Sequence, residues 1–345
     1  MTIQFFDTDR PAIAGLAIRI ADPAKDLETM VEISNAAAVA DGGDHRTTVE
    51  QQRANILHPF GFDPARHLFV ITVEGVIVAW LRLNLRDTVV GERVFGVYIM
   101  VSPAWRGRGI EAWLLRGAQR LTQVWDRESP HATGATATLL DAFCLKSNTA
   151  RREALEAHGY TACRWIFLMT RPLDGNYPDF RLPEDLVVRP VTRSQFRQCF
   201  DFDTEAFRDH WGFAPPTEDD YLRRVNDPDI FPALFKVAFD REGRIAGQVM
   251  NFIDESENLA CGRTRGYTED ISTRSDQRRR GVARALIVES LKMFQALGMT
   301  EAALHVDTEN ATGALSVYLD CGYTEHSTTV VYRRPLYDTP KESTQ

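Results

Sequence analysis

Two short basic stretches, Arg106–Glu111 (RGRGIE) and Arg278–Ala283 (RRRGVA), decide the fold class of this chain of 345 residues. Each stretch follows a β-type run and directly precedes a strongly helical run. The first amides of a helix have no partner inside the helix, and the positive end of the helix dipole lies at the same terminus. A strand, a basic glycine turn and a helix N-terminus together therefore predict a cradle for an anion such as pyrophosphate.

The two stretches belong to an internal repeat. Arg278 follows Arg106 by 172 residues (278 − 106), and Asn310 follows Asn148 by 162 residues (310 − 148). Two further matches pair Glu74–Ala79 with Glu242–Gly247 and Gly159-Tyr160 with Gly322-Tyr323. A nearly constant offset with small changes in loop length is typical of a duplicated fold. The repeat therefore predicts two related nucleotide-binding domains.

The boundary between the two domains is visible in the local composition. The hydrophobic run Trp165–Met169 is followed by a segment over 173–184 that concentrates proline, glycine and polar residues, and a new strand starts at Leu186. With 44% hydrophobic and 26% charged residues, the chain suits two globular domains of roughly 150–170 residues each. We predict one domain over 1–172, a linker over 173–184 and a second domain over 185–345.

Composition argues against several classes of protein. The net charge of -8 disfavours a general nucleic-acid role, and no run approaches the ~20 apolar residues of a membrane span. The N-terminal segment Met1–Arg10 carries Asp7 and Asp9 and does not read as a signal peptide. The five cysteines are scattered, lack metal-type spacing and have no obvious activating histidine. They predict reduced thiols in a cytoplasmic protein, with neither a metal site nor a catalytic cysteine.

The periodicity of apolar residues predicts the order of helices and strands. In the second half it predicts helices over Arg193–Phe207, Glu218–Val225, Val282–Leu297 and Ala311–Leu319. It predicts strands over Leu234–Phe239, Ile245–Phe252, Gly266–Thr273 and Ala302–Val306, with Tyr323–Arg333 closing the sheet. The first half repeats this order, with strands His67–Val73, Ile77–Leu83 and Val94–Val101 and the helix Ile110–Val124. Because strands and helices are interleaved but hairpins are present, we predict an α/β fold with a mixed sheet in each domain.

The strand order, the basic turn and the spacing resemble the GCN5-related N-acetyltransferase (GNAT) superfamily. The cofactor turn of that family reads Gln/Arg-x-x-Gly-x-Gly/Ala, which Arg278, Gly281 and Ala283 fit. The family pattern continues with an Asn, a helix bearing a Tyr, and Gly-Phe/Tyr, matched here by Asn310, Tyr318 and Gly322-Tyr323. The resemblance covers nearly the whole chain as two tandem copies. This arrangement is similar to that of mycothiol synthase and other tandem acetyltransferases.

The resemblance implies that the second half binds acetyl-CoA as co-substrate. Backbone amides and arginines of the turn would hold the pyrophosphate, and the edge of the preceding strand would pair with the pantetheine amides. The residues expected to bind the cofactor are Ile271, Ser272, Thr273, Arg278, Arg279, Arg280, Gly281, Val282, Ala283 and Asn310. The implied reaction is direct transfer of an acetyl group, in a ternary complex, to the primary amine of a small molecule.

Acyl transfer also needs an acid for the leaving thiolate and a proton acceptor for the amine. By resemblance the hydroxyl of Tyr318 faces the cofactor sulfur, and a phenol of pKa about 10 is protonated at neutral pH. For the base we favour Glu269, which a regular strand places on the same face as Ile271 and Thr273. Asp270, which a bulge would exchange with Glu269, and His305 on the next strand remain alternatives.

An acceptor wall is expected from the first two helices of the second half. Its candidate residues are His210, Trp211 and Tyr221, because aromatic rings beside the acidic residues of this segment suit a cationic amine. The alternative, with the rings in the core and the acids in water, stays open.

The first half departs from the family pattern at two places. Glu111 stands where Gly or Ala belongs, and a carboxylate there would repel pyrophosphate unless it turns to solvent. The helical positions that should hold Tyr carry Leu155 and Glu156. Arg106, Arg108 and Gly109 could still hold a cofactor weakly. We therefore expect catalysis in the second half and a structural or substrate-shaping role for the first.

Two other functions remain open at this stage. One is a non-catalytic protein that senses or sequesters acyl-CoA, and the other is an acetyltransferase acting on peptide N-termini or lysines. The acceptor amine, the length of the acyl group and the oligomeric state do not follow from the sequence.

Overall fold

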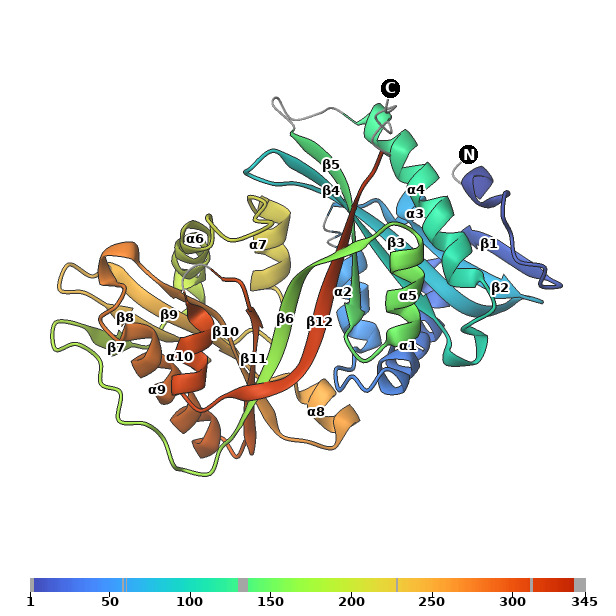
Figure 1. Ribbon diagram of the computed structural model, residues 1–345. Helices are drawn as coiled ribbons and strands as arrows, with labels where there is room; N and C mark the ends of the chain where they lie inside the picture. Colours follow the sequence, from blue (N-terminus) through green and yellow to red (C-terminus); the bar gives the residue numbers. More distant parts are fainter. Residues whose placement is uncertain are drawn as a thin grey trace, which may run out of the picture. The chain divides into compact units, whose positions relative to one another are not determined.

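The computed structural model describes residues 3–57, 59, 61–129, 136–227, 229–310 and 313–337. The chain forms two compact units. Unit 1 contains Met1–Arg164 and Thr329–Gln345, and unit 2 contains Trp165–Thr328. Figure 1 shows the elements of both units, coloured along the sequence.

Unit 1 is a mixed sheet with helices on both faces. Its strand order is β1-β2-β3-β4-β5-β12. The strands are β1 (Leu16–Ile20), β2 (Leu68–Val73), β3 (Val76–Asp87), β4 (Glu92–Val101), β5 (Ala137–Leu145) and the second part of β12 (Thr324–Pro335). The helices are α1 (Pro23–Ala40), α2 (Val49–Leu57), α3 (Pro64–His67), α4 (Ile110–Glu128) and α5 (Thr149–Ala157). Trp113 of α4 packs in one core cluster with strand residues, and Met30 of α1 packs in another with Trp80 of β3.

Unit 2 has the same plan, with the strand order β6-β11-β10-β9-β8-β7. The strands are β6 (Thr161–Pro172, from Trp165 on), β7 (Val187–Arg189), β8 (Lys236–Phe239), β9 (Ile245–Phe252), β10 (Arg265–Thr273) and β11 (Glu301–Asp307). The helices are α6 (Phe196–Ala206), α7 (Glu218–Val225), α8 (Glu255–Cys261), α9 (Val282–Ala296) and α10 (Ala314–Asp320). In both units most neighbouring strands are antiparallel, and one pair, β4 with β5 or β10 with β11, is parallel. The predicted α/β fold with mixed sheets is confirmed.

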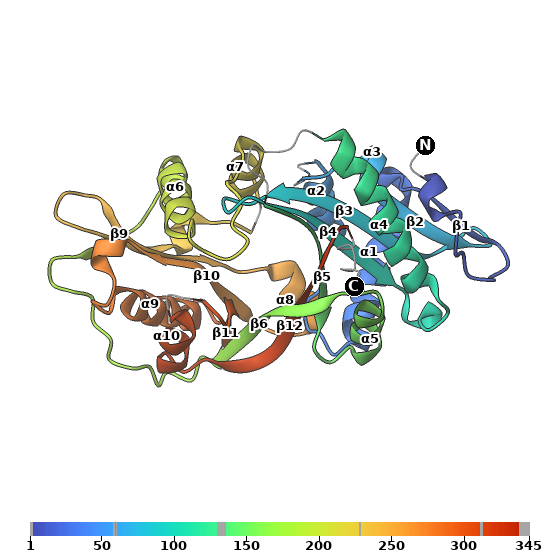
Figure 2. The same cartoon turned by 45° about the horizontal axis from the view of Figure 1, so that its top comes forward.

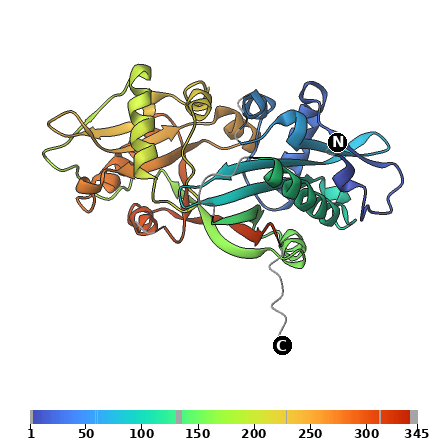
Figure 3. The ribbon, with the colours of Figure 1, turned by 90° about the horizontal axis from the view of Figure 1, so that it is seen from above.

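Helices α6 and α9 lie on opposite sides of the strands of unit 2 (Figures 2 and 3). Leu286, Leu291 and Phe294 recur at helical spacing along α9 and are completely buried against the sheet. On the other face, Phe196 of α6 packs against Val237 of β8. Burying each such side chain contributes roughly 1.5–3 kcal/mol, so both helices are anchored by their apolar faces. This anchoring fixes the N-terminus of α9 at the edge of the sheet.

Two strands, β6 and β12, are each divided between the units, because the boundaries fall after Arg164 and after Thr328. Residues 329–335 of β12 pair antiparallel with β5 of unit 1, and residues 166–172 of β6 pair antiparallel with β11 of unit 2. Figure 1 shows β6 in green and β12 in red. The expectation that Tyr323–Arg333 closes the sheet of the second half was therefore wrong for residues 329–333, which pair with β5, whereas residues 323–328 belong to unit 2. The compact units are accordingly divided differently from the linear domains 1–172 and 185–345 predicted from composition.

Most element bounds agree with the sequence prediction to within a few residues, and β9 and α7 agree at both ends. Helix α8 was missed because its seven residues, ESENLAC, show no apolar periodicity. The side chain of Asp254 accepts a hydrogen bond from the amide of Glu257 and so begins this helix. Residues 311 and 312, at the predicted start of α10, lie outside the described residues. No helix in the described part of the chain is both long and apolar enough to cross a membrane.

Candidate functional site

The site begins where β10 and β11 part. The two strands pair in parallel only between Arg265–Tyr267 and Glu301–Ala303. Beyond these residues both strands continue, to Thr273 and Asp307, without pairing to each other in the described register. Their facing edges are therefore available to a ligand with amide groups of its own.

A cavity of about 760 Å³ lies between the parted strands, the N-terminus of α9 and helix α10, all within unit 2. This volume is in the range of small-molecule and cofactor sites. The predicted residues that line it are Glu269, Asp270, Ile271, Ser272, Thr273, Arg278, Arg279, Gly281, Val282, Ala283, His305, Asn310, Tyr318 and His210. The structure thus brings together residues that span more than one hundred positions in the sequence.

The turn before α9 has the backbone that an anion cradle requires. Gly281 is the N-cap of α9 and has φ 82°. This backbone conformation would be strained for a residue that carries a side chain. No atom lies within 4 Å of the point where a Cβ on Gly281 would stand, so the space over the turn is open. The first amides of α9 have no partner inside the helix, and Arg278 and Arg279 add positive charge beside them. These features fit a pyrophosphate.

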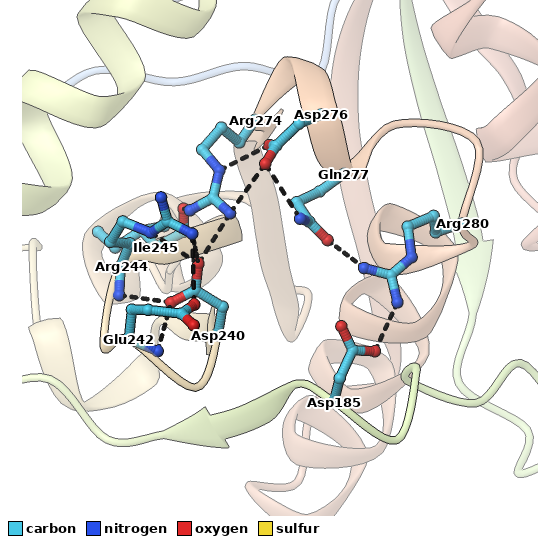
Figure 4. A network of polar contacts seen from close by, with 9 residues as sticks. All are labelled: Asp185, Asp240, Glu242, Arg244, Ile245, Arg274, Asp276, Gln277 and Arg280. Atoms are coloured by element: carbon cyan, nitrogen blue, oxygen red, sulfur yellow. Dashed lines mark hydrogen bonds and ion pairs between the residues drawn. The ribbon is translucent and has the colours of Figure 1, made fainter.

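A network of ion pairs and hydrogen bonds connects the residues before the turn to the β8–β9 hairpin (Figure 4). Arg274 donates to Asp240 at 2.8 Å, to Asp276 at 2.7 Å and to the carbonyl of Ile245 at 2.8 Å. Burial opposes the ionisation of Asp240, but the amide of Arg244 and the guanidinium groups of Arg274 and Arg244 outweigh it and lower the pKa of Asp240 to about 2. The network therefore links the β8–β9 hairpin to the strand end from which the turn leaves.

Arg280 belongs to this network rather than to the cavity wall. Its guanidinium lies 2.5 Å from Asp185 and also contacts Gln277 (Figure 4). Arg280 is not among the described residues that line the cavity. Arg278 and Arg279 do line the cavity, and the expected contacts of the three arginines with a cofactor stay predictions.

A bulge in β10 changes which residues share a face. Glu269 pairs with Met250, but the next pair is Ser272 with Gln248, so β10 carries one residue more than β9 between them. The prediction that Glu269, Ile271 and Thr273 share a face was therefore wrong, because a bulge reverses the alternation.

The extra residue of the bulge is held by an ion pair. Asp270 has φ 45°, an uncommon value for a residue other than glycine, and its carboxylate is paired with Arg224 of α7. Asp203 of α6 lies close to Arg224, and burial raises the pKa of the Asp203 carboxyl to about 6 against the attraction of Arg224. Asp270, one of the alternative bases, is thus paired with a guanidinium group.

Glu269 and His305 meet across the gap between the strands. The imidazole Nδ1 of His305 is 2.8 Å from Oε1 of Glu269, and the backbone N–H of His305 donates to the same oxygen at 3.0 Å. Glu269 and His305, the alternative bases expected from the sequence, are thus joined in one hydrogen-bonded pair.

Tyr318 of α10 is buried, with 7% of its surface exposed, and still lines the cavity. Burial, together with the negative charge of Glu269, raises the pKa of its hydroxyl above the ordinary value. Tyr318 therefore stays protonated at neutral pH and can donate a proton or a hydrogen bond.

The three predicted acceptor residues have different surroundings. His210 lines the cavity with Phe207, their ring centroids 4.2 Å apart, and burial lowers the pKa of His210. Tyr221 instead packs against Phe196 and Phe200 in the helical layer. Neither Tyr221 nor Trp211 is among the described residues that line the cavity.

The corresponding turn of unit 1 is filled by its own side chains. Glu111 forms an ion pair with Arg151 of α5 at 2.6 Å. The same guanidinium donates to the carbonyls of Ile99 on β4 and Phe143 on β5, at 3.0 and 3.1 Å. Arg151 thus bridges the two strands whose counterparts in unit 2 are parted. The side chain of Glu111 is 22% exposed, so it does not turn fully to solvent.

Arg106 and Arg108 of the first turn also contact side chains of unit 1. Arg106 pairs with Asp41 at 2.5 Å, and Arg108 lies over the ring of Trp105 at 4.5 Å from its centroid. Pro11 lies 3.6 Å from the point where a Cβ on Gly109 would stand. Leu155, which occupies the position expected for the acid, is completely buried.

Comparison with known proteins agrees with this geometry. The sequence profile of the acetyltransferase (GNAT) family matches the chain twice, over residues 27–160 and 196–323. The chain belongs to this family. It is an N-acetyltransferase with two GNAT domains in tandem, which confirms the resemblance seen in the sequence.

Curated relatives span nearly the whole GNAT chain. A mycothiol acetyltransferase of Thermobispora bispora is 28% identical over 319 residues, which cover 92% of this chain and 99% of the relative. A mycothiol acetyltransferase of Streptomyces avermitilis is 26% identical over 308 residues, covering 89% and 91%. The match therefore includes both GNAT copies.

Solved structures share the tandem fold. A GCN5-related N-acetyltransferase from Sphaerobacter thermophilus has a TM-score of 0.71 at 24% identity and covers 96% of this chain and 98% of its own. A tandem GNAT protein from the clavulanic acid biosynthesis pathway has a TM-score of 0.68 at 14% identity, covering 94% and 99%. These likenesses concern the fold.

Some cavity residues of the GNAT site were not found from the sequence. Asp307, Arg284 and Gly313 line the cavity without belonging to a motif that the sequence analysis used. Gly313 could have been found from the repeat. The offset of 162 that relates Asn148 to Asn310 also relates Arg151 to Gly313 (313 − 151), so a small residue replaces a large one at this position of the second copy.

Proposed function

We propose that the chain is an acetyl-CoA-dependent N-acetyltransferase that acetylates the primary amine of a small molecule by direct transfer in a ternary complex, with catalysis in unit 2. The main support is that one cavity contains the N-terminus of α9, the parted edges of β10 and β11, and Tyr318. The relatives named mycothiol acetyltransferase make a thiol-linked amine the first acceptor class to test. A cytoplasmic site of action belongs to the same proposal.

The residues of the cavity fit the parts of acetyl-CoA. The amides from Arg279 to Ala283, with the side chains of Arg278 and Arg279, would hold the pyrophosphate. Ile271–Thr273 at the free edge of β10 would pair with the pantetheine amides. Acetyl-CoA supplies an acetyl group activated as a thioester.

Tyr318 would act on the leaving group. Its buried, protonated hydroxyl can donate to the sulfur as the acetyl group leaves, which avoids release of a free thiolate into a cavity that is partly apolar. Glu269 and His305 provide the proton acceptor for the amine. Both tasks are thus served by side chains of one unit.

A melting experiment with acetyl-CoA tests the cofactor site. At 100 times its dissociation constant a ligand stabilises the folded state by about 2.7 kcal/mol, which raises the melting temperature. Gly281→Glu should abolish this shift by placing a carboxylate in the cradle. Gly109→Glu is the matched control, because Gly109 is also an N-cap glycine with φ 81° but lies in unit 1. An undiminished shift in Gly281→Glu would contradict the assignment.

An assay of CoA release separates the remaining functions. We expect release with a small amine from a panel of amino sugars, polyamines, aminoglycosides and thiol-linked amines. Binding of acetyl-CoA without release for any acceptor would indicate an acyl-CoA-binding protein instead. Release only with peptides would indicate a protein acetyltransferase.

A further inference from the structure

Glu269 of β10 and His305 of β11 are bonded to each other at the point where the cavity opens between the two strands. We propose that His305 is the residue that takes the proton from the attacking amine, and that Glu269 is its positioning residue. This inference rests on the proposed function. It reverses the preference for Glu269 as base that the sequence alone supported.

The hydrogen bonds define the tautomer of the ring. Oε1 of Glu269 accepts from Nδ1 of His305 at 2.8 Å and from the backbone N–H of the same residue at 3.0 Å. A carboxylate can only accept, so Nδ1 carries the proton and the neutral ring has its lone pair on Nε2. The two bonds to one oxygen fix the orientation of the imidazole relative to the strand.

Exposure assigns the two roles. The side chain of His305 is 54% exposed and lines the cavity, whereas that of Glu269 is 22% exposed. The ring is therefore the member of the pair that an incoming amine reaches more easily. Glu269 lies behind it, as a carboxylate does when it orients a histidine in other acyl-transfer sites.

The chemistry of the two groups favours the same assignment. A general base works best when its pKa is close to the working pH, and a free imidazole has a pKa of about 6.5 against about 4.3 for a glutamate carboxyl. The imidazole is therefore the better matched base near neutral pH.

The proton balance closes with His305 and Tyr318. The acceptor enters as a neutral amine, and its nitrogen bonds to the acetyl carbon as the bond from that carbon to sulfur breaks. The proton of the amine passes to Nε2 of His305, and the hydroxyl proton of Tyr318 passes to the departing sulfur. The imidazolium then returns a proton through solvent to the phenolate. The products are an amide and a free thiol, and both residues regain their starting forms.

Other ionisable groups line the same cavity as the pair. They are Asp270 of β10, Asp307 of β11, Tyr318 of α10, Arg284 of α9, Arg278 and Arg279 of the turn, and His210 after α6. Strand β6, on the far side of β11, places Leu168 opposite His305. Because His210 is a second imidazole in the cavity, it needs a variant of its own in any measurement of pH dependence.

The test is kcat as a function of pH at saturating acetyl-CoA and amine, where ionisation of the free amine does not enter. The wild type should lose activity at low pH as His305 becomes protonated. His305→Gln should lower kcat on the order of 10²–10⁴-fold and remove this acid limb, with the dissociation constant of acetyl-CoA unchanged. Glu269→Gln should keep the limb but move it to lower pH, because a neighbouring carboxylate favours the imidazolium. His210→Gln should keep the limb at its wild-type pH.

Controls exclude a merely structural effect. His326→Gln and Glu255→Gln change an exposed residue of each type outside the cavity lining, and both should leave kcat unchanged. In His305→Ala, added imidazole should restore part of the lost rate, and the backbone N–H that binds Glu269 is retained. The acetyl-CoA melting shift confirms that each variant is folded.

Two results would overturn the inference. If His305→Gln kept wild-type kcat and the acid limb while Glu269→Gln lost both, Glu269 would be the base. If His305→Ala bound acetyl-CoA normally but was inactive and was not rescued by imidazole, His305 would have a structural role only. Absence of CoA release by the wild type with every amine would instead overturn the proposed function, and the inference with it.

Discussion

Two small residues keep the cavity of unit 2 open. Ala283 and Gly313 line it, and the repeat places them at the positions of Glu111 and Arg151 in unit 1 (283 − 111 = 172; 313 − 151 = 162). In unit 1 the large pair forms a salt bridge between α4 and α5, and in unit 2 its absence leaves room for a ligand. A charged pair in one copy and a small pair in the other therefore explain why the copies differ.

We predict one tight acetyl-CoA site per chain and a strong effect of charge at position 283. Ala283→Glu should weaken acetyl-CoA binding at least about tenfold, equivalent to ~1.4 kcal/mol, because a carboxylate repels the pyrophosphate. Ala283→Gln, of similar size but neutral, should weaken it less. Calorimetric titration measures both affinity and stoichiometry. Two tight, equivalent sites in the wild type, or equal affinities of the two variants, would refute the explanation.

Tyr318→Phe should slow turnover without loss of the cofactor. The substitution removes only the hydroxyl, so kcat should fall on the order of 10²–10⁴-fold while the dissociation constant of acetyl-CoA stays nearly unchanged. Tyr177→Phe removes the hydroxyl of a tyrosine that bonds Gln295 outside the cavity lining, and it should not affect kcat. A wild-type kcat in Tyr318→Phe would return Tyr318 to a packing role.

The sequence could predict those site residues whose position depends on local geometry. Gly281 and the helix that follows it are neighbours in the chain, so their spacing alone predicts the cradle. The partner of Arg280 is Asp185, which is 95 residues away, and the partner of Asp270 is Arg224 on another helix. Such ion pairs depend on tertiary structure, and for that reason the orientation of Arg280 and the bulge in β10 were not predictable.

Among the elements, the hairpin between β8 and β9 has a role beyond connecting two strands. Asp240 accepts from the amides of Glu242 and Arg244 in the hairpin and also from Arg274, which leads into the 3₁₀ turn Ser275–Gln277. The hairpin is predictable from its Asp and Gly residues, because turn chemistry is local. Its link to the turn before α9 is a contact between distant segments, and sequence spacing contains no signal for it.

The ionisation of Asp240 gives this element a pH dependence. Its pKa is lowered from an ordinary value near 4 to about 2, so the stabilisation is present above about pH 4 and is lost as the pH falls toward 2. Asp240→Asn should therefore unfold more easily than the wild type at neutral pH, and the difference should shrink over this window. Urea unfolding at a series of pH values measures it, with Glu242→Gln, an exposed carboxylate of the same hairpin, as control. A difference independent of pH would contradict the role of the charge.

At the scale of the whole molecule, each sheet includes residues of a strand that is divided between the two units, β12 in unit 1 and β6 in unit 2. Unit 1 needs residues 329–335 of β12 beside β5, and unit 2 needs residues 166–172 of β6 beside β11. The repeat predicted two copies correctly, because each copy has its own turn, helix and strand pattern. It could not reveal the division of the last strands, since β6 and β12 occupy equivalent places in the repeat and either could pair in either sheet.

A truncated chain tests this division. Ending the chain at Thr328 removes the antiparallel partner of β5, although residues 1–164, with β4 on the other side of β5, are all present. Amides of Leu139–Leu145 in β5 should then exchange with solvent much faster than in the full chain. A chain that ends at Tyr337 keeps all of β12 and should retain the slow exchange of β5. Equal protection of β5 in both truncated chains would contradict the pairing.

The shared strands also bear on how such a gene can evolve. A duplicated copy without a ligand is normally free to be deleted, and we predict that unit 1, whose turn is closed by the contact of Glu111 with Arg151, is such a copy. Deleting it would, however, cut the coding sequence inside β6, from which unit 2 takes its own edge strand, and would leave the end of β12 with no sheet to join. If catalysis takes place in unit 2, as we propose, selection for that site would preserve unit 1 as well, and the two halves would be inherited together.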